Sequence, residues 1–395
     1  MMLKIQGDVN MRDAYIIGGY ATETGKLKDD FNLLGARAAK GAIEDAGVKA
    51  KDIERAYVGN AFNGNAVGQS VFAVLGMCGE NLPITNVEGY CSSGGLAIHH
   101  AIDDVRYGKH EITIGVGAEN LTLHRGTGTA FAINFNDPNP EGMHGMPMPG
   151  KYGSRARVYM NETDCTKEDL ADVVVRVRRN AAKNPRAWMR KPVTREEVLA
   201  SRMIADPITL LMCCGITDAA GAVVIASEDV VKRLGISKPV KVAGSVMISG
   251  PVDVGHVDST GDDITELASA MLYKEAGIGP EDIDLCEIHD AFAICELLYY
   301  EALGFCKKGE GFIYQREGKS DHGGECVFSP RGGLLANGHP VGGTGALQIA
   351  ESYYQLKGRC GDYQVDNAKV ALAHVTGGGI YGAEHAVATL HMLTV

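Results

Sequence analysis

A cysteine in a glycine-rich turn carries the sharpest chemical signal in this sequence. Cys91 stands in Val-Glu-Gly-Tyr-Cys-Ser-Ser-Gly-Gly, a pattern that predicts a tight turn at the start of a helix. The positive end of a helix dipole stabilises a thiolate and lowers the pKa of a thiol placed there. Cysteine is also an ordinary small buried residue, so the position at this turn is what favours a nucleophile.

Two histidines are candidates to work with that thiol. His339 stands in Asn-Gly-His-Pro-Val-Gly-Gly-Thr-Gly, and an imidazole there could take the proton of a cysteine nucleophile. The turn could alternatively hold phosphates, although it matches neither a P-loop nor a dinucleotide-binding fingerprint. His289, in Glu-Ile-His-Asp-Ala-Phe-Ala, ends a predicted strand, where ligand sites of parallel α/β sheets lie. A structural core histidine is the alternative for His289.

Two further patterns could be mistaken for sites or could complete one. The Gly-Gly-Gly turn after His374 ends a predicted strand, and its N–H groups could donate to an oxyanion, or it simply terminates the strand. Cys286 with His289, and His322 with Cys326, lack the four-ligand spacing of structural zinc, so we expect no metal ion.

An internal duplication supplies the elements that position these residues. Ala46-Gly-Val, Asp52-Ile-Glu and Ala61-Phe recur as Ala276-Gly-Ile, Asp282-Ile-Asp and Ala291-Phe, at a constant offset of 230 positions (276 minus 46). Each copy predicts a strand, a helix, a glycine stop and a second strand. The ranges are 14–19, 31–45 and 55–58 in the first copy, and 240–247, 264–275 and 285–288 in the second. Two βαβ units favour parallel sheets covered by helices.

The same symmetry pairs the two chemical turns. The turn at Cys91 leads through a helix to a strand at 112–116, and the turn at His339 leads through a helix to a strand at 370–374. Two helix starts related by a pseudo-twofold axis could face one pocket. We predict an N-terminal half from 1–119 plus 206–238, a C-terminal half at 239–395, and an inserted substrate-facing loop domain at 120–205.

Composition limits the setting. The chain has 395 residues, 45% of them hydrophobic, 22% charged and 51 of them glycine, which is typical of a soluble α/β protein. A net charge of −11 argues against nucleic acid or a membrane surface as the main partner. The basic clusters 176–179 and 186–191 are either solvated helix faces or a site for nucleotide phosphates. Without a membrane span, leader or peroxisomal signal, we expect a cytoplasmic protein whose ten irregularly spaced cysteines are free thiols.

Taken together and in this order, the three glycine-rich turns resemble those of the thiolases over essentially the whole chain. His289-Asp-Ala-Phe, where many thiolases have Asn-Glu-Ala-Phe, is similar to the sterol-carrier-protein-like thiolases and their archaeal and bacterial relatives. So are the segments 152–160 and 201–207 and the pair Cys213-Cys214. The resemblance implies a five-layered αβαβα fold, a homodimer or dimer of dimers, and coenzyme A as substrate, with no permanently bound cofactor.

The resemblance also implies roles. Cys91 would carry the acyl group, His339 would activate it, and His289 with His339 would form an oxyanion hole for the thioester enolate. The N–H groups of Cys91 and Gly377 would form a second hole, for the oxyanion at the attacked 3-oxo carbon. The sequence departs from the family at the second cysteine, which handles the α-carbon proton, because the two positions that can supply it hold Val375 and Ala291.

Another acid is therefore needed, and His339, an ordered water or Cys295 could serve, since Cys295 follows Ala291 by one helical turn. The loss favours a specialised degradative thiolase, for instance one resembling the benzoylsuccinyl-CoA thiolases. A small zinc-ribbon/OB-fold partner protein is a further implication of this branch. The rival interpretations are a decarboxylating condensing enzyme like the ketoacyl synthases, since the site holds a Cys-His-His set, and a non-catalytic acyl-CoA-binding scaffold subunit.

Overall fold

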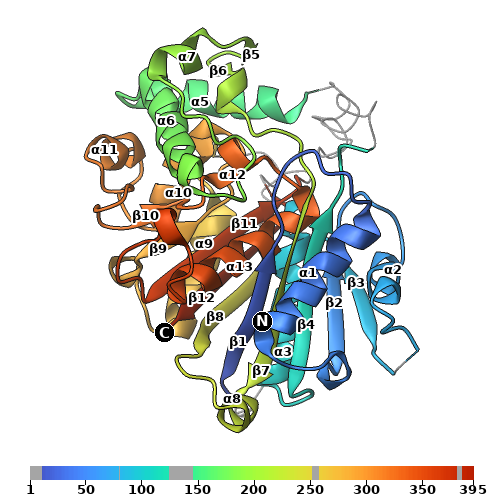
Figure 1. Ribbon diagram of the computed structural model, residues 1–395. Coiled ribbons are helices and arrows are strands. Elements are labelled where there is room, and N and C mark those ends of the chain that lie inside the picture. The colour runs from blue at the N-terminus through green and yellow to red at the C-terminus, as the bar shows by residue number, and fades with distance from the viewer. Residues whose placement is uncertain (1–10, 80, 124–145, 251–257, 380–384) are drawn as a thin grey trace, which may run out of the picture.

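A computed structural model describes residues 11–79, 81–123, 146–250, 258–379 and 385–395. Its strands form one large sheet in which each half of the chain contributes five neighbours (Figure 1). The N-terminal half has the order β3-β2-β4-β7-β1 and the C-terminal half the order β10-β9-β11-β12-β8. The strands are β1 (Ala14–Ala21), β2 (Arg55–Gly59), β3 (Ile84–Val87), β4 (Ile112–Glu119), β7 (Ala219–Ser227), β8 (Val240–Ser249), β9 (Leu285–Glu287), β10 (Val327–Phe328), β11 (Val370–Gly377) and β12 (Val387–Thr394).

The two halves meet at β1 and β8, which pair antiparallel through Tyr15 with Lys241 and Ile16 with Val240. The matching strand order on either side of this junction is the structural form of the sequence duplication. The helices α1 (Phe31–Ala46) and α9 (Asp263–Ala276) end at Gly47 and Gly277, both left-handed with φ 67°, and β2 and β9 begin 230 positions apart. The repeat was therefore interpreted correctly.

The expectation of parallel sheets was only partly right. β2 pairs parallel with β3 and β4, and β9 pairs parallel with β10 and β11, but β7 and β12 run antiparallel to their neighbours. A crossover that returns a strand in parallel needs a dozen or more residues. The connection from β11 to β12 spans only residues 378–386, so β12 has to run antiparallel.

Helices cover both outer faces and fill the space between the two half-sheets, which makes five layers in the order αβαβα. α1, α2 (Val67–Val74) and α8 (Glu228–Leu234) pack on the outer face of the N-terminal half, and α9 packs on that of the C-terminal half. α3 (Ser93–Arg106) and α13 (Thr344–Leu356) lie between the half-sheets and share one buried cluster with strands of both. The predicted fold is thus confirmed.

The segment between β4 and β7 forms the helices α5 (Met148–Glu162), α6 (Lys167–Lys183) and α7 (Arg195–Ala200) and the short strands β5 (Met203–Ala205) and β6 (Ile208–Thr209). These elements gather at one end of the molecule, next to α10 (Ala293–Ala302), α11 (Gly311–Arg316) and α12 (Gly333–Asn337) (Figure 1). The predicted loop region 120–205 lies in part outside the described residues, and its boundaries stay a prediction.

The basic clusters are solvated only in part, because Arg179, Arg190 and Lys191 are exposed while other members are buried. A site for nucleotide phosphates stays a prediction. Arg176 is buried and forms an ion pair with Glu296, and Arg186 forms one with Glu351. Arg178 donates to the carbonyl of Lys191. The guanidinium groups of Arg176 and Arg186 thus link the α6 region to the C-terminal half. All ten cysteines are free, and no helix in the described ranges combines the length and apolar character needed to cross a bilayer.

Candidate active site

The turn before α3 holds Cys91 in a constrained backbone. Tyr90 has φ 49°, in the left-handed region that a residue with a side chain rarely adopts, and a single 3-10 turn over Tyr90–Ser92 leads directly into the helix. The hydroxyl of Ser92 donates to the carbonyl of Val375 at 3.0 Å, which ties the turn to the end of β11. Cys91 is 6% exposed, so its thiol has little freedom to move.

Glycines let the starts of α3 and α13 approach each other. A Cβ atom on Gly94 would lie 2.7 Å from the carbonyl oxygen of Gly342 and 2.9 Å from the backbone nitrogen of Ala346. A Cβ atom on Gly345 would lie 2.6 Å from the nitrogen of Gly95. Backbone atoms cannot step aside as a flexible side chain can, so only glycine allows this contact. The glycines of both turns therefore serve helix packing, which leaves no reason to assign them to phosphate binding.

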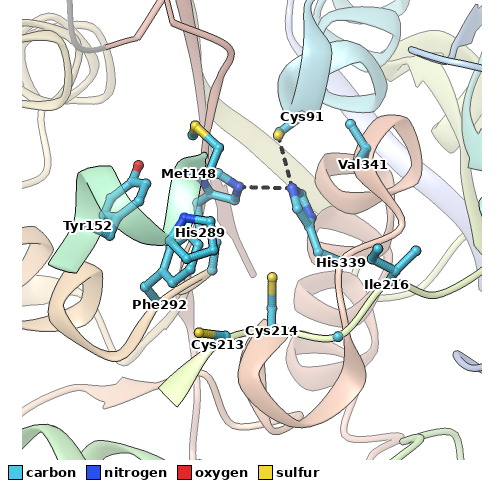
Figure 2. A pocket seen from close by; sticks show the side chains of 13 residues that line it. Cys91, Met148, Tyr152, Cys213, Cys214, Ile216, His289, Phe292, His339 and Val341 are labelled. Atoms are coloured by element: carbon cyan, nitrogen blue, oxygen red, sulfur yellow. Dashed lines mark hydrogen bonds between the residues drawn. The ribbon is translucent and has the colours of Figure 1, made fainter. Parts of the chain in front are cut away.

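The packing brings the nucleophile candidate and both histidines into direct contact. Cys91 Sγ lies 2.9 Å from His339 Nε2, which in turn lies 3.2 Å from His289 Nε2 (Figure 2). The far nitrogen of each ring is held by a hydroxyl, since His339 Nδ1 lies 2.8 Å from Thr344 Oγ1 and His289 Nδ1 lies 3.0 Å from Thr376 Oγ1. Both rings are thus fixed in orientation, with their Nε2 atoms facing the thiol and each other.

Burial sets the charge state of this group. It raises the pKa of the Cys91 thiol to about 12, against the opposing effect of the Gly378 and Cys91 backbone N–H groups. Burial also lowers the pKa of His339 to about 3 and that of His289 well below its usual range. Burial thus acts against the lowered thiol pKa that the helix start predicts. The resting site holds a neutral thiol beside neutral imidazoles.

A buried carboxylate supports the turn that carries His339. Glu119, at the end of β4, accepts hydrogen bonds from the backbone N–H groups of Gly342, Ala61 and Phe62 at 2.9, 2.9 and 3.0 Å. Burial raises its pKa to about 7, although these three donors act in the opposite direction. Glu119 therefore joins the His339 turn to the loop that follows β2. No sequence pattern singled it out.

The thiol and histidines face a cavity of about 270 Å³. One wall is aromatic, because the rings of Tyr152 and Phe292 stack with their centroids 4.5 Å apart. The cavity is lined by Cys91, Met148, Pro149, Tyr152, Cys213, Cys214, Gly215, Ile216, His289, Ala291, Phe292, His339 and Val341. The lining comes from both halves and from α5, which agrees with the sequence-based idea that the inserted segment faces the substrate.

The structure brings together Cys91, His289 and His339, as the sequence predicted. Gly377 is adjacent, because a Cβ atom there would lie 3.2 Å from the nitrogen of Cys91, but the N–H that reaches the thiol is that of Gly378. Cys295 is buried in α10 and does not line the cavity. The sequence offered no reason to single out Thr344 and Thr376, which contact the histidines, and it indicated Tyr152, Cys213 and Cys214 only as family markers.

The three donor atoms of Cys91, His289 and His339 lie within 4.8 Å of one another, so this group could also bind a soft cation such as Zn²⁺. The two pairs considered in the sequence, Cys286 with His289 and His322 with Cys326, are not this group. Cys286 instead lies 3.6 Å, sulfur to sulfur, from Cys326. The expectation that the protein carries no metal ion stays a prediction.

Comparisons with known proteins agree with the geometry. The family model described as "Thiolase, N-terminal domain" matches residues 14–229, and "Thiolase C-terminal domain-like" matches residues 255–391. The chain is 52% identical to the benzoylsuccinyl-CoA thiolase subunit BbsB of Thauera aromatica over 93% of this chain and 95% of that protein. It is 39% identical to the acetyl-CoA acetyltransferase of Methanothermobacter thermautotrophicus, over 93% and 97%. Rabbit (Oryctolagus cuniculus) sterol carrier protein 2 is 34% identical over 92% and 68%.

Solved structures give the same result. The Ltp2-ChsH2(DUF35) aldolase matches with a TM-score of 0.80 and 26% identity, over 97% of this chain and 98% of that chain. The human mitochondrial 3-ketoacyl-CoA thiolase in complex with CoA matches with a TM-score of 0.74 at 19% identity, over 98% and 99%, which speaks for the fold alone. The chain belongs to the thiolase family of acyltransferases. Within that family it is similar to a subunit of a benzoylsuccinyl-CoA thiolase and to the sterol-carrier-protein-like enzymes.

Proposed function

We propose that this protein cleaves or forms a 3-oxoacyl-CoA through an acyl intermediate on Cys91, with coenzyme A as the second substrate and no permanently bound cofactor. The observation that carries the proposal is the 2.9 Å contact between Cys91 Sγ and His339 Nε2, in a cavity that also holds His289. A neutral imidazole at that distance is placed to accept the thiol proton as the sulfur attacks a carbonyl carbon.

One proton arrangement satisfies every contact. His339 carries its proton on Nδ1 and donates it to Thr344 Oγ1, which leaves Nε2 free to accept the proton of Cys91. His289 carries its proton on Nε2, and its Nδ1 accepts the hydroxyl proton of Thr376. The phenol of Tyr299, 3.2 Å from Thr376 Oγ1, completes the chain as a donor.

This arrangement also gives the histidines their second role. Once His339 has accepted the proton, both Nε2 atoms carry hydrogens and face the space where the enolate oxygen of the departing thioester forms. The backbone N–H groups of Cys91 and Gly377, together with that of Gly378, would stabilise the oxyanion at the attacked 3-oxo carbon. In thiolysis, coenzyme A then takes the acyl group from Cys91.

We propose a substrate of the benzoylsuccinyl-CoA type. Cleavage between its α-carbon and the 3-oxo carbon would leave a benzoyl group on Cys91 and release succinyl-CoA. The stacked rings of Tyr152 and Phe292 offer an aromatic wall to a phenyl ring. The cavity of about 270 Å³ exceeds the roughly 150 Å³ that suffices to hold benzene in an apolar site. The 52% identity to a protein named for this substrate supports the same choice.

The wider setting belongs to the proposal as well. We propose a homodimer or dimer of dimers in the cytoplasm, with halves at 1–119 plus 206–238 and at 239–395 around the inserted segment 120–205. Two similar proteins support a small zinc-ribbon/OB-fold partner. The Thauera protein is named a subunit, and the name of the Ltp2-ChsH2(DUF35) aldolase includes a DUF35 component.

Mass spectrometry of the intact protein tests the proposal. After exposure to benzoyl-CoA or acetyl-CoA we expect one added acyl group in the native protein and none in Cys91→Ser. Turnover of malonyl thioesters with loss of carbon dioxide would instead indicate the ketoacyl-synthase-like alternative. Absence of an adduct with every thioester would favour the scaffold alternative and refute the proposed chemistry.

A further inference from the structure

Cleavage of the C–C bond leaves the electron pair of that bond on the α-carbon, which has to receive a proton. The residues assigned so far do not supply this proton. The two positions at which the family supplies a second cysteine hold Val375 and Ala291, whose side chains cannot transfer one. Both lie at the site, since Ala291 lines the cavity and Val375 packs in one cluster with Cys91. A proton donor has to reach the same space from elsewhere in the chain.

The segment 213–216 runs between the residues after β9, which carry His289, and the turn after α12, which carries His339. Cys214 donates its backbone N–H to the carbonyl of Ala291 at 2.8 Å, and His339 donates its backbone N–H to the carbonyl of Gly215 at 2.7 Å. Bridges from Cys213 to Phe292 and from Ile216 to His339 fix the two ends of the segment. The backbone of Cys214 is therefore fixed beside Ala291, one of the two positions that lack the second thiol.

The two thiols of this segment point in different directions. The sulfur of Cys214 is directed into the space between the rings of His289 and His339, whereas that of Cys213 is turned toward the side of Phe292 (Figure 2). Cys213 Sγ lies 3.5 Å from the carbonyl oxygen of Thr209, where its proton is engaged. Of these two thiols, Cys214 is the one that faces the space in which the enolate would form.

We propose that Cys214 is the acid that protonates the α-carbon of the departing thioester, and the base that removes that proton in the condensation direction. This inference rests on the proposed function. Burial raises the pKa of Cys214 well above its usual range, with the charge of Cys91 a lesser cause of the same sign. Such a thiol is protonated at rest, and its thiolate is a strong base toward an α-proton.

The step balances through one full turnover. His339 takes the proton of Cys91, the thiolate attacks the 3-oxo carbon, and the bond to the α-carbon breaks with its electron pair going to that carbon. The α-carbon takes the proton of Cys214, which becomes a thiolate. Coenzyme A then gives its thiol proton to Cys214 and attacks the acyl group, and Cys91 leaves as a thiolate that recovers its proton from His339. Every group ends as it began.

Exchange of α-protons of succinyl-CoA with D₂O, measured by NMR, tests Cys214 apart from acyl transfer. We expect Cys214→Ala and Cys214→Ser to lose exchange by roughly 100-fold or more, which is the usual contribution of a positioned acid–base group. Both variants should still form the acyl adduct on Cys91 with benzoyl-CoA, which also shows that they are folded. Cys295→Ala removes another buried thiol that lies outside the cavity, and this variant should exchange like the native protein.

A rescue separates proton transfer from a structural role. In the Cys214→Ala background, Ala291→Cys puts a thiol on the residue whose carbonyl Cys214 contacts, and we expect it to restore at least a tenth of the native exchange rate. The assignment is wrong if Cys214→Ala or Cys214→Ser exchanges the α-protons of succinyl-CoA as fast as the native protein does. It is also wrong if the acylated native protein does not exchange these protons at all. If the native protein forms no adduct with any thioester, the proposed function itself fails, which is a separate result.

Discussion

Replacing Gly94 by alanine is expected to separate the nucleophile from its base without touching either side chain. The new Cβ atom would lie 2.7 Å from Gly342 O and 2.9 Å from Ala346 N, whereas ordinary contact begins at 3.4 Å. The starts of α3 and α13 would therefore have to move apart by roughly 0.7 Å, the difference between 3.4 and 2.7 Å. Cys91 precedes α3 on the same rigid turn and would move with it.

The expected loss follows from the contact that this movement breaks. If the full displacement reaches the site, the distance from Cys91 Sγ to His339 Nε2 grows from 2.9 Å to about 3.6 Å, which lengthens the path of the proton to the ring. Misplacement of about 1 Å typically costs about 100-fold in rate, so we expect acylation of Cys91 to slow roughly 10- to 100-fold. Overpacking should also lower the free energy of unfolding by about 1–3 kcal/mol.

The assay is the rate of adduct formation on Cys91, followed by mass spectrometry well below the unfolding temperature of each variant. Gly150→Ala is the matched control, because the nearest atoms to its Cβ lie 3.6 Å away in side chains, so it should acylate at the native rate. Acylation by Gly94→Ala within twofold of the native rate would show that the glycine contact does not set the catalytic distance. A slow Gly150→Ala would show that the assay reports general loss of structure.

Three further predictions concern the histidines. Thr376→Val removes the hydroxyl that His289 Nδ1 contacts at 3.0 Å while keeping the side-chain volume. We expect kcat to fall roughly 5- to 30-fold from the loss of one hydrogen bond to a reacting group. An unchanged kcat would show that Thr376 does not orient the ring of His289. The pKa of His339 is lowered to about 3, so its ring stays neutral and able to accept a proton as the pH falls from 8 to 5.5. The acylation rate should therefore not drop through pH 6.5, as it would for a histidine of ordinary pKa. A drop near pH 7 that vanishes in Glu119→Gln would belong to Glu119, whose pKa is about 7. Zn²⁺ should inhibit acylation reversibly, with full recovery in EDTA, because the donor atoms of Cys91, His289 and His339 lie within 4.8 Å of one another. His289→Ala should need at least tenfold more Zn²⁺ for the same inhibition. Equal sensitivity of this variant and the native protein would place the metal elsewhere.

Much of the fold and of the site could be predicted from the sequence because the determining signals are local. The repeated helix, left-handed glycine and strand, at Gly47 and again at Gly277, depend on turn chemistry within a few residues, so the 230-residue offset predicted two equivalent halves. The turns of Cys91 and His339 were also recognisable locally, since glycine, proline and a reactive side chain occur side by side. Twofold pairing of these turns then predicted one shared pocket.

The remaining features depend on contacts between distant parts of the chain. Cys214 reaches the site because its backbone bonds to Ala291, 77 positions away (291 minus 214), and nothing in its immediate sequence indicates this. The pKa of Cys91 rises because the tertiary structure buries its thiol, which acts against the effect that the helix start predicts. Local pattern therefore indicated Cys91, His289 and His339, while tertiary burial and long-range hydrogen bonds decided their charge states and brought Cys214 to the same cavity.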